Sequence, residues 1–400
     1  MGLTGCAPPR FTDSPTAAAA PPIPGGSSLD ISSPAALIYS PPTSQPQPPD
    51  FKPSRRLPET AETGHTETAF SRLERGWMVT TDGVHLPLRV WLPYDGTDDP
   101  APPQESRDRP IRAALVALHG FNDYSNAFAI PAPIWAKAGI ATFAYDQRGF
   151  GANPHPGRWP GMETLEGDLR TAVALVRRRL PGVPVYALGE SMGGAVVLAT
   201  AATTPDESRS DLSGTGRPDG LILVSPAIWG RTTQPLLNRL ALWAGARLMP
   251  GARFTGEGLG VRASDNLPML VALGRDPLII KATRVDAIYG LMNLMDAGLA
   301  AALAFPPGDS LPSLYLYGAH DRLVPRNAVT AFLAHWPEDT GHRFAYYPHG
   351  WHMLLRDLDG ARVAADVSAW IENHTNPLPS GADRNARQRL RAEKRDFDED

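Results

Sequence analysis

This 400-residue chain has a single cysteine, no long apolar run and no large excess of charge of one sign. The one cysteine, Cys6, has no second thiol for an internal disulfide and no neighbours for a cysteine-based zinc cluster. No stretch reaches the roughly 18 uninterrupted apolar residues of a membrane-spanning helix. The 38 Lys and Arg residues are mixed along the chain with 42 Asp and Glu residues, so there is no basic stripe. We therefore expect no transmembrane helix and no nucleic-acid partner, and the scattered histidines predict no metal site.

What the chain does contain is enough apolar sequence for a large core, 42% by residue, between two polar ends. Residues 1–60 are rich in Pro, Ala, Ser and Thr and predict a disordered leader, because they bury too little apolar surface to offset the entropy of ordering. Residues 376–400 are highly charged and predict a solvated, disordered tail, with at most a frayed helix around Arg387 to Arg395.

Between these ends, strand-like and helix-like segments alternate. Eight apolar runs have the composition of strands: 76–83, 86–93, 111–120, 140–146, 183–190, 220–227, 311–321 and 342–350. Helical spacing follows in 162–180, 191–202, 325–336 and 358–374. This alternation predicts an α/β protein with a mostly parallel eight-stranded sheet flanked by helices, formed by 61–226 and 309–375. The first two runs have no helix between them, so we expect an antiparallel hairpin at one edge.

Residues 227–308 break the alternation after the sixth strand. The segment reads as several helices with large apolar faces, and it is too long to be a simple connection. We interpret it as a helical cap over the carboxyl ends of the strands, where parallel sheets bind ligands. The alternative is a second packing layer without a functional role.

A serine flanked by glycines, in "YALGESMGGAVV" (186–197), raises the question of whether Ser191 is a nucleophile or a turn residue. Gly189, Ser191 and Gly193 match G-x-S-x-G, a weak pattern alone, since roughly 0.2 chance matches are expected here. The match ends a β-like run and opens a helical one, which is the setting of a nucleophile elbow. A turn that tight favours glycine two positions either side of the serine. The context therefore favours a nucleophile at a helix N-terminus.

A serine nucleophile needs an imidazole base, and the base needs a carboxylate to orient it. Asp321 follows the seventh strand-like run, and His352 follows the eighth. The chain order Ser191, Asp321, His352 is that of α/β-hydrolases. His320 is too near Asp321 in sequence to face it, whereas His349 stays open as an alternative to His352.

Six segments together resemble the α/β-hydrolase superfamily, and within it the monoacylglycerol lipase and lysophospholipase-like serine hydrolases, a group that includes serine aminopeptidase-type hydrolase domains. The resemblance runs from about Gly76 to Asn373. The segments are "ALHGF" (117–121), "YDQRGFG" (145–151), "GESMGG" (189–194), "RDPLI" (275–279), "YGAHDRLVP" (317–325) and "GWHMLL" (350–355).

The resemblance implies roles for several further residues. It implies that the backbone N–H groups of Phe121 and Met192 stabilise an oxyanion, and it favours His352 over His349 as the base. His119 would shape its loop, and Asp146 and Arg148 would fix a turn, with a substrate contact as the alternative role of Arg148. Phe121 departs from the small residue usual in eukaryotic members, and its ring could narrow an acyl pocket.

The expected function is therefore hydrolysis of carboxylic esters through an acyl-enzyme, with monoacylglycerol- or lysophospholipid-type lipid esters as the preferred substrates and no cofactor. Two alternatives stay open: an aminopeptidase or amidase of the same fold, and a non-catalytic binding protein that kept the fold.

The lone cysteine closes "LTGC" (3–6), which resembles the lipobox of bacterial lipoproteins. That reading predicts lipidation of Cys6 and a membrane-anchored protein on the periplasmic side, and it requires a signal sequence upstream of the residues given. The alternative is a stray cysteine in a cytoplasmic protein.

Overall fold

The computed structural model describes the chain in eight ranges. They are 36–39 (backbone only), 70–94, 109–202, 216–231, 236–255, 260–303, 311–337 and 341–392. Cys6, the rest of the predicted leader and residues 393–400 lie outside this part, so predictions about them stay predictions. Within it, no helix is both long and apolar enough to cross a membrane.

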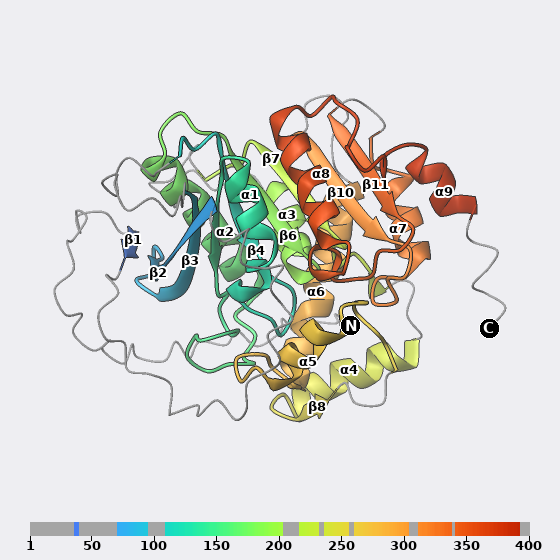
Figure 1. The fold of residues 1–400 in the computed structure, drawn as a ribbon. Helices are drawn as coiled ribbons and strands as arrows, with labels where there is room; N and C mark the ends of the chain where they lie inside the picture. The colour runs from blue at the N-terminus through green and yellow to red at the C-terminus, as the bar shows by residue number, and fades with distance from the viewer. Residues whose placement is uncertain are drawn as a thin grey trace, which may run out of the picture.

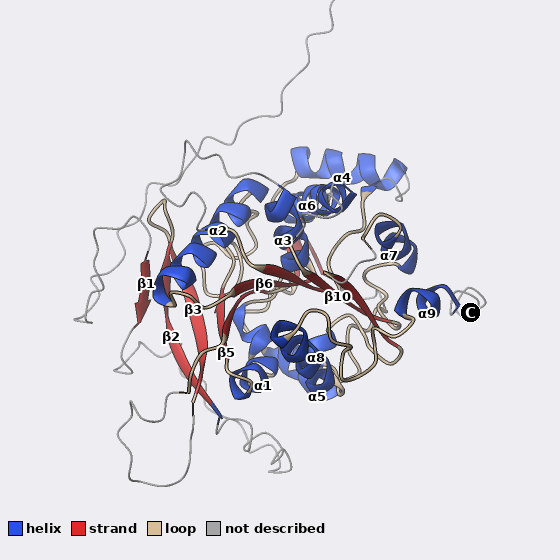
Figure 2. Cartoon of the chain, turned by 90° about the horizontal axis from the view of Figure 1, so that it is seen from above, coloured by secondary structure: helices blue, strands red, loops and turns tan. Residues whose placement is uncertain are grey.

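A nine-stranded twisted sheet runs through the molecule (Figures 1 and 2). Its order is β1-β2-β3-β5-β4-β6-β7-β10-β11. The strands are β1 (Ala36–Tyr39), β2 (Ser71–Val79), β3 (His85–Pro93), β4 (Ala113–Leu118), β5 (Ile140–Tyr145), β6 (Val185–Glu190), β7 (Gly220–Val224), β10 (Ser313–Gly318) and β11 (His342–Tyr347). From β5 to β11 all neighbours are parallel, whereas β1, β2 and β3 are antiparallel.

The eight predicted strands and the antiparallel pair are confirmed, because each fully buried strand is a continuous apolar run. One part of the leader prediction is wrong. Ala36–Tyr39 forms β1, which pairs with the free edge of β2 and becomes the outermost strand.

Helices cover both faces of the sheet (Figure 2). One face carries α1 (Pro131–Lys137) and α8 (Gly360–Glu372), and the other carries α2 (Met162–Arg179), α3 (Met192–Ala202), α6 (Val285–Leu303) and α7 (Arg326–Leu333). Trp135 and Trp370 fill the core on the first face, and both are fully buried. The proline-rich helix α1 was not predicted; its first residue, Pro131, is a common helix starter.

The inserted segment forms α4 (Leu236–Leu248), β8 (Arg253–Thr255), α5 (Leu267–Arg275), β9 (Ala282–Arg284) and α6, and α4, α5 and β8 gather at one end of the core (Figure 1). Two details correct the expectation of a purely helical cap over 227–308. β8 and β9 form a small antiparallel sheet. Helix α6 belongs largely to the core, because Gly298 lies against Ala195 of α3 and Leu294 is fully buried.

The prediction of a disordered tail over 376–400 is wrong for residues 376–392. Helix α9 (Ala386–Ala392) packs at the end of the sheet near β11 and α7 (Figure 1). Four apolar side chains spaced four residues apart are buried in this segment: Leu378, Ala382, Ala386 and Leu390. Arg387 donates to backbone carbonyls at the end of α7, so the charged residues of the segment make specific contacts.

Candidate active site

Ser191 lies in the turn between β6 and α3 with a backbone φ of +52°. Few residues other than glycine adopt this left-handed conformation, and it persists only where the surroundings enforce it. Here the N–H of Ser191 donates to the carbonyl of Val224 on β7 (2.9 Å), and its carbonyl accepts from Ala227 (2.9 Å). The turn is therefore the strained elbow that the motif predicts.

The glycines of the motif are required by close approach. A Cβ at Gly189 would lie 2.3 Å from the backbone of Gly193, and one at Gly193 would lie 2.3 Å from the carbonyl oxygen of Leu118 on β4. Any larger side chain would push α3 away from the sheet and move Ser191.

The structure brings His352 and Asp321 together from the loops after β11 and β10. The imidazole Nδ1 donates to Asp321 Oδ2 at 2.8 Å, and both side chains are buried. The other carboxylate oxygen accepts from the backbone N–H groups of Leu323 and Val324. This bond fixes one tautomer of His352 and leaves Nε2 as the proton acceptor, which is the arrangement of a catalytic base.

The surroundings raise the pKa of His352 above its ordinary value of 6.5. Burial alone would lower it, but Asp321 and, more weakly, Glu190 favour the charged form and outweigh both burial and the opposing charge of Arg356. The site therefore stabilises the imidazolium that forms when a serine gives up its proton.

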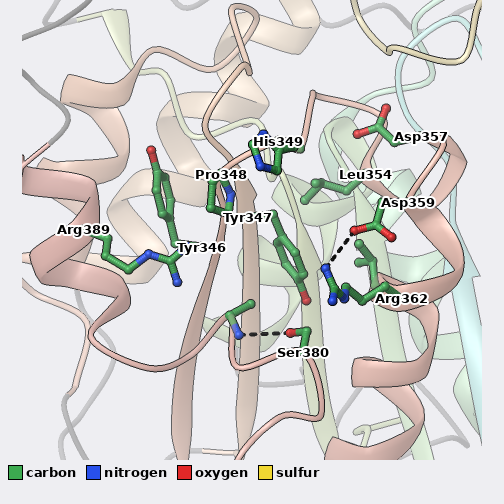
Figure 3. A pocket seen from close by; sticks show the side chains of 13 residues that line it. Tyr346, Tyr347, Pro348, His349, Leu354, Asp357, Asp359, Arg362, Ser380 and Arg389 are labelled. Atoms are coloured by element: carbon green, nitrogen blue, oxygen red, sulfur yellow. Dashed lines mark hydrogen bonds and ion pairs between the residues drawn. The ribbon is translucent and has the colours of Figure 1, made fainter.

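The competing histidines lie elsewhere. His349 is exposed and lines a separate hollow of about 240 Å³ between β11, α8 and α9, to which neither Ser191 nor His352 contributes (Figure 3). His320 stacks on Trp351, with ring centroids 5.1 Å apart. His352 is bonded to Asp321 at 2.8 Å, so the geometry favours His352 as the base.

The loop after β4 lies beside the serine, since a Cβ at Gly120 would be 3.4 Å from the Cβ of Ser191. The expected oxyanion donors are the N–H groups of Phe121 in this loop and of Met192 at the first turn of α3. Neither amide donates to another described residue. The ring of Phe121 packs edge-on against Phe150 (5.5 Å) and near Trp159 (6.5 Å).

His119, Asp146 and Arg148 hold the loops in place. His119 donates from Nδ1 to the carbonyl of Gly120 and accepts at Nε2 from the N–H of Gln147. Asp146 accepts from Ser125 and Ala152.

Arg148 binds the carboxylates of Asp82 and Asp168, with bonds of 2.6 to 2.8 Å. This supports a turn-fixing role over a substrate contact.

A buried ion cluster beside the site was not predicted. Arg356 binds Asp123 (2.7 Å) and both oxygens of Glu190 (3.1 and 3.2 Å). Glu190 immediately precedes the serine, which is the one signal in the sequence that could have pointed to it.

The cap is tied to the same loops. On one side, Tyr124 donates to Asp276 (2.7 Å) and Asn122 to Thr283 (2.7 Å). On the other side, residues 263–266 make four hydrogen bonds to the loop that carries His352: Met353 N to Ala263 O, Ser264 Oγ to Asp357, Asn266 Nδ2 to Arg356 O and Leu358 N to Asp265.

Among the described residues, no group of three or more His, Cys, Asp or Glu side chains is placed to hold a metal ion. The groups gathered at this edge of the sheet are the hydroxyl of Ser191, the imidazole–carboxylate pair of His352 and Asp321, and the backbone N–H donors.

The strand order, with an elbow serine after β6 and an Asp–His pair after β10 and β11, defines an α/β-hydrolase. A family model described as "Serine aminopeptidase, S33" matches residues 109–359. The chain belongs to that family.

Curated and solved relatives are similar over most of their length. The chain is 27% identical to a monoacylglycerol lipase of Mycolicibacterium smegmatis over 301 residues (73% of this chain, 94% of the relative). It is 23% identical to human monoglyceride lipase over 322 residues (80% and 97%). Among solved structures, a soluble variant of the Saccharomyces cerevisiae monoglyceride lipase superposes with a TM-score of 0.57 at 20% identity, covering 74% of this chain and 94% of that one. The monoacylglycerol lipase of Paleococcus ferrophilus gives 0.54 at 19% (66% and 96%).

Proposed function

We propose that the chain is a serine hydrolase that cleaves carboxylic esters, with monoacylglycerol- or lysophospholipid-type lipid esters as substrates. The observation that carries the proposal is the buried 2.8 Å bond between His352 and Asp321, in the same molecule as a strained elbow serine.

In the first half of the reaction, Ser191 Oγ attacks the ester carbonyl while His352 Nε2 takes its proton. The negative charge on the carbonyl oxygen is stabilised by the N–H groups of Phe121 and Met192, and loss of one such donor typically raises the barrier by about 3 kcal/mol. His352 then gives the proton to the leaving alcohol, and the acyl group stays on Ser191.

In the second half, His352 takes a proton from water, which attacks the acyl-enzyme and releases the acid. The proton returns to Ser191 as the second tetrahedral intermediate collapses. Asp321 keeps Nδ1 protonated throughout. No step requires a cofactor.

The cap supports a lipid ester as the substrate. It presents large apolar side chains that are substantially exposed: Leu237, Leu240, Trp243, Leu248, Met249, Phe254, Leu267 and Val271. Such a surface suits acyl chains better than sugars or peptides. The relatives that are named monoacylglycerol lipases support the same class.

A peptide substrate with a free amino group would need a carboxylate in the cap that is free to bind that group. In the described part of the cap each aspartate already has a protein partner. The pairs are Asp265 with Leu358 N, Asp276 with Tyr124, Asp286 with Arg284, and Asp296 with Arg231. This favours ester hydrolysis over aminopeptidase activity.

The test is a substrate panel of short p-nitrophenyl esters, long-chain monoacylglycerols, lysophospholipids and an aminoacyl-naphthylamide, given to the wild type, Ser191→Ala and His352→Ala. We expect long-chain ester turnover that both substitutions abolish. A preference for the naphthylamide would establish the aminopeptidase alternative. No turnover and no labelling of Ser191 by a fluorophosphonate would establish a binding protein.

We also propose that the protein is anchored to a membrane through a lipid on Cys6. The support is the "LTGC" tetrapeptide followed by a proline- and alanine-rich segment long enough to serve as a tether. Intact-mass analysis of the protein from its native host tests this, since a diacylglyceryl modification would add a defined mass and an unmodified Cys6 would refute the anchor.

A further inference from the structure

Each of the three loops that carry the proposed reacting groups contributes one member to the buried ion cluster. Glu190 immediately precedes Ser191, Asp123 is two residues after Phe121, and Arg356 is four residues after His352. Arg356 Nη1 is 2.7 Å from Asp123 Oδ2, and Nη2 is 3.1 and 3.2 Å from the two oxygens of Glu190. One guanidinium therefore joins the oxyanion loop, the elbow and the base loop.

All three side chains are almost completely enclosed, with exposed fractions of 4% for Arg356, 7% for Asp123 and 2% for Glu190. Burying charges is costly, and a buried ion pair is often no more stabilising than apolar packing. A guanidinium has a planar fork that can bind two carboxylates in fixed directions, whereas an ammonium acts as a point charge. The cluster is thus better suited to fixing geometry than to adding stability.

The backbone around Arg356 is also fixed. Its N–H donates to the carbonyl of Met353 (2.8 Å), and its carbonyl accepts from Asn266 of the cap (2.9 Å). A change in the position of the guanidinium would therefore be transmitted to the loop that carries His352.

We propose that Arg356 is a positioning residue. By binding Glu190 and Asp123 at once, it fixes the relative positions of the serine, the oxyanion amides and the base. This inference rests on the proposed serine hydrolase function.

The cluster also has an electrostatic effect on the base. The charged groups that face His352 are Asp321, Glu190 and Arg356. Glu190 raises the pKa of His352 and Arg356 lowers it. On the acidic side, the rate falls as His352 becomes protonated. Removing the charge of Glu190 should therefore move this fall to lower pH, and removing the charge of Arg356 should move it to higher pH. A residue that only stabilised the fold would not produce that pattern.

The test compares Arg356→Met, Arg356→Lys and Glu190→Gln with a control, Arg343→Met. Arg343 also forms an ion pair with a buried aspartate, Asp383 (2.5 Å), but it lies at the start of β11, at the opposite end of that strand from the base loop. For each variant the measurements are kcat and KM for an ester that the wild type cleaves, the rate of fluorophosphonate labelling, the pH profile and the melting temperature.

We expect Arg356→Met to lower kcat and the labelling rate by roughly 100-fold with KM little changed, the size of effect that a displacement of about 1 Å produces. Arg356→Lys should recover part of this loss, because the charge returns without the fork. Glu190→Gln should lose less and move the acidic limb to lower pH, whereas Arg356→Met should move it to higher pH. Arg343→Met should lower the melting temperature and leave kcat unchanged.

A wild-type kcat and pH profile in folded Arg356→Met would overturn the proposal. If that variant does not fold, Glu190→Gln and Arg356→Lys decide, because wild-type kcat and pH profiles in both would equally refute it. A wild type that neither turns over esters nor reacts with the fluorophosphonate would instead overturn the proposed function.

Discussion

At the scale of single residues, the two carboxylate oxygens of Asp321 bind different partners. Oδ2 accepts from His352, while Oδ1 accepts from the N–H groups of Leu323 (2.8 Å) and Val324 (2.9 Å). The carboxylate is therefore fixed by its own loop before it orients the imidazole. This explains how an aspartate in the loop after β10 can serve as the third member of a triad.

Replacing Asp321 with Asn should lower kcat by about 10³- to 10⁴-fold, because an amide facing Nδ1 favours the wrong tautomer. The pKa of His352 lies above 6.5, so wild-type kcat/KM should fall as the pH drops through that raised value. Without the charge of Asp321, the limb of the residual activity should move to lower pH. The pH dependence of kcat/KM for the variant and for the control His349→Gln measures this. An acidic limb at the wild-type pH in Asp321→Asn would show that Asp321 does not raise the pKa of His352.

Gly193 is required by its contact with the backbone of β4. A Cβ there would lie 2.3 Å from Leu118 O, and neither backbone can give way without separating α3 from the sheet. Gly193→Ala should therefore lower the free energy of unfolding by about 3 kcal/mol or more.

Gly274 in α5 provides the matched control, since a Cβ at that position meets nothing within 4 Å. Gly274→Ala should be neutral or stabilising by up to about 1 kcal/mol. Urea unfolding measures both variants, and equal stabilities would mean that the elbow tolerates a side chain.

At the scale of elements, the sequence predicted the strands that have a strong apolar signal. It missed strand β1 and helix α9, in which that signal is weak. Strands β4, β5, β6, β7 and β10 are apolar runs buried on both faces, and composition is enough to locate them. Strand β1 has only four residues, and its backbone pairing with the edge of β2 leaves little compositional signal. Helix α9 buries only Ala386 and Leu390, four residues apart among several arginines, so its composition did not reveal the narrow apolar stripe that packs.

The contribution of α9 can be measured with one pair of substitutions. Leu390 is buried in the core on the α7 side, whereas its neighbour Arg391 is exposed. Leu390→Ala should cost about 2 to 3 kcal/mol of unfolding free energy, and Arg391→Ala less than about 0.5 kcal/mol. Equal effects in urea denaturation would mean that the C-terminal segment does not contribute to the fold.

At the scale of the whole molecule, the candidate site depends on contacts between distant segments. Ser191, Asp321 and His352 could be identified because each lies in the loop that follows a strand, in a known order. The ion pair between Arg356 and Glu190 joins residues 166 positions apart, and neither belongs to a pattern that predicts the other. The same holds for the contacts of the cap with the two loops at the site. Only the folded chain reveals these pairs.

One of these long-range contacts should make stability depend on pH. Asp357 accepts from Ser264 of the cap (2.6 Å) and from the N–H of Trp351, next to His352 (2.7 Å), so it joins the cap to the base loop. Burial raises its pKa from 3.8 to about 6, against the opposing effect of these hydrogen bonds. Because the folded-state value is the higher one, the folded protein holds this proton more tightly than the unfolded chain does.

As the pH rises from about 4 to about 6, the unfolded chain therefore loses the proton first, and the stabilisation from protonated Asp357 is lost. Asp357→Asn cannot titrate, so the wild type should gain stability relative to this variant as the pH falls from about 7 to about 5. Melting temperatures across this range measure the difference, with Asp359→Asn as the control because its carboxylate is exposed. Parallel curves for the wild type and Asp357→Asn would mean that Asp357 does not take up a proton between pH 7 and pH 5 in the folded protein. The pH dependence of stability would then not come from Asp357.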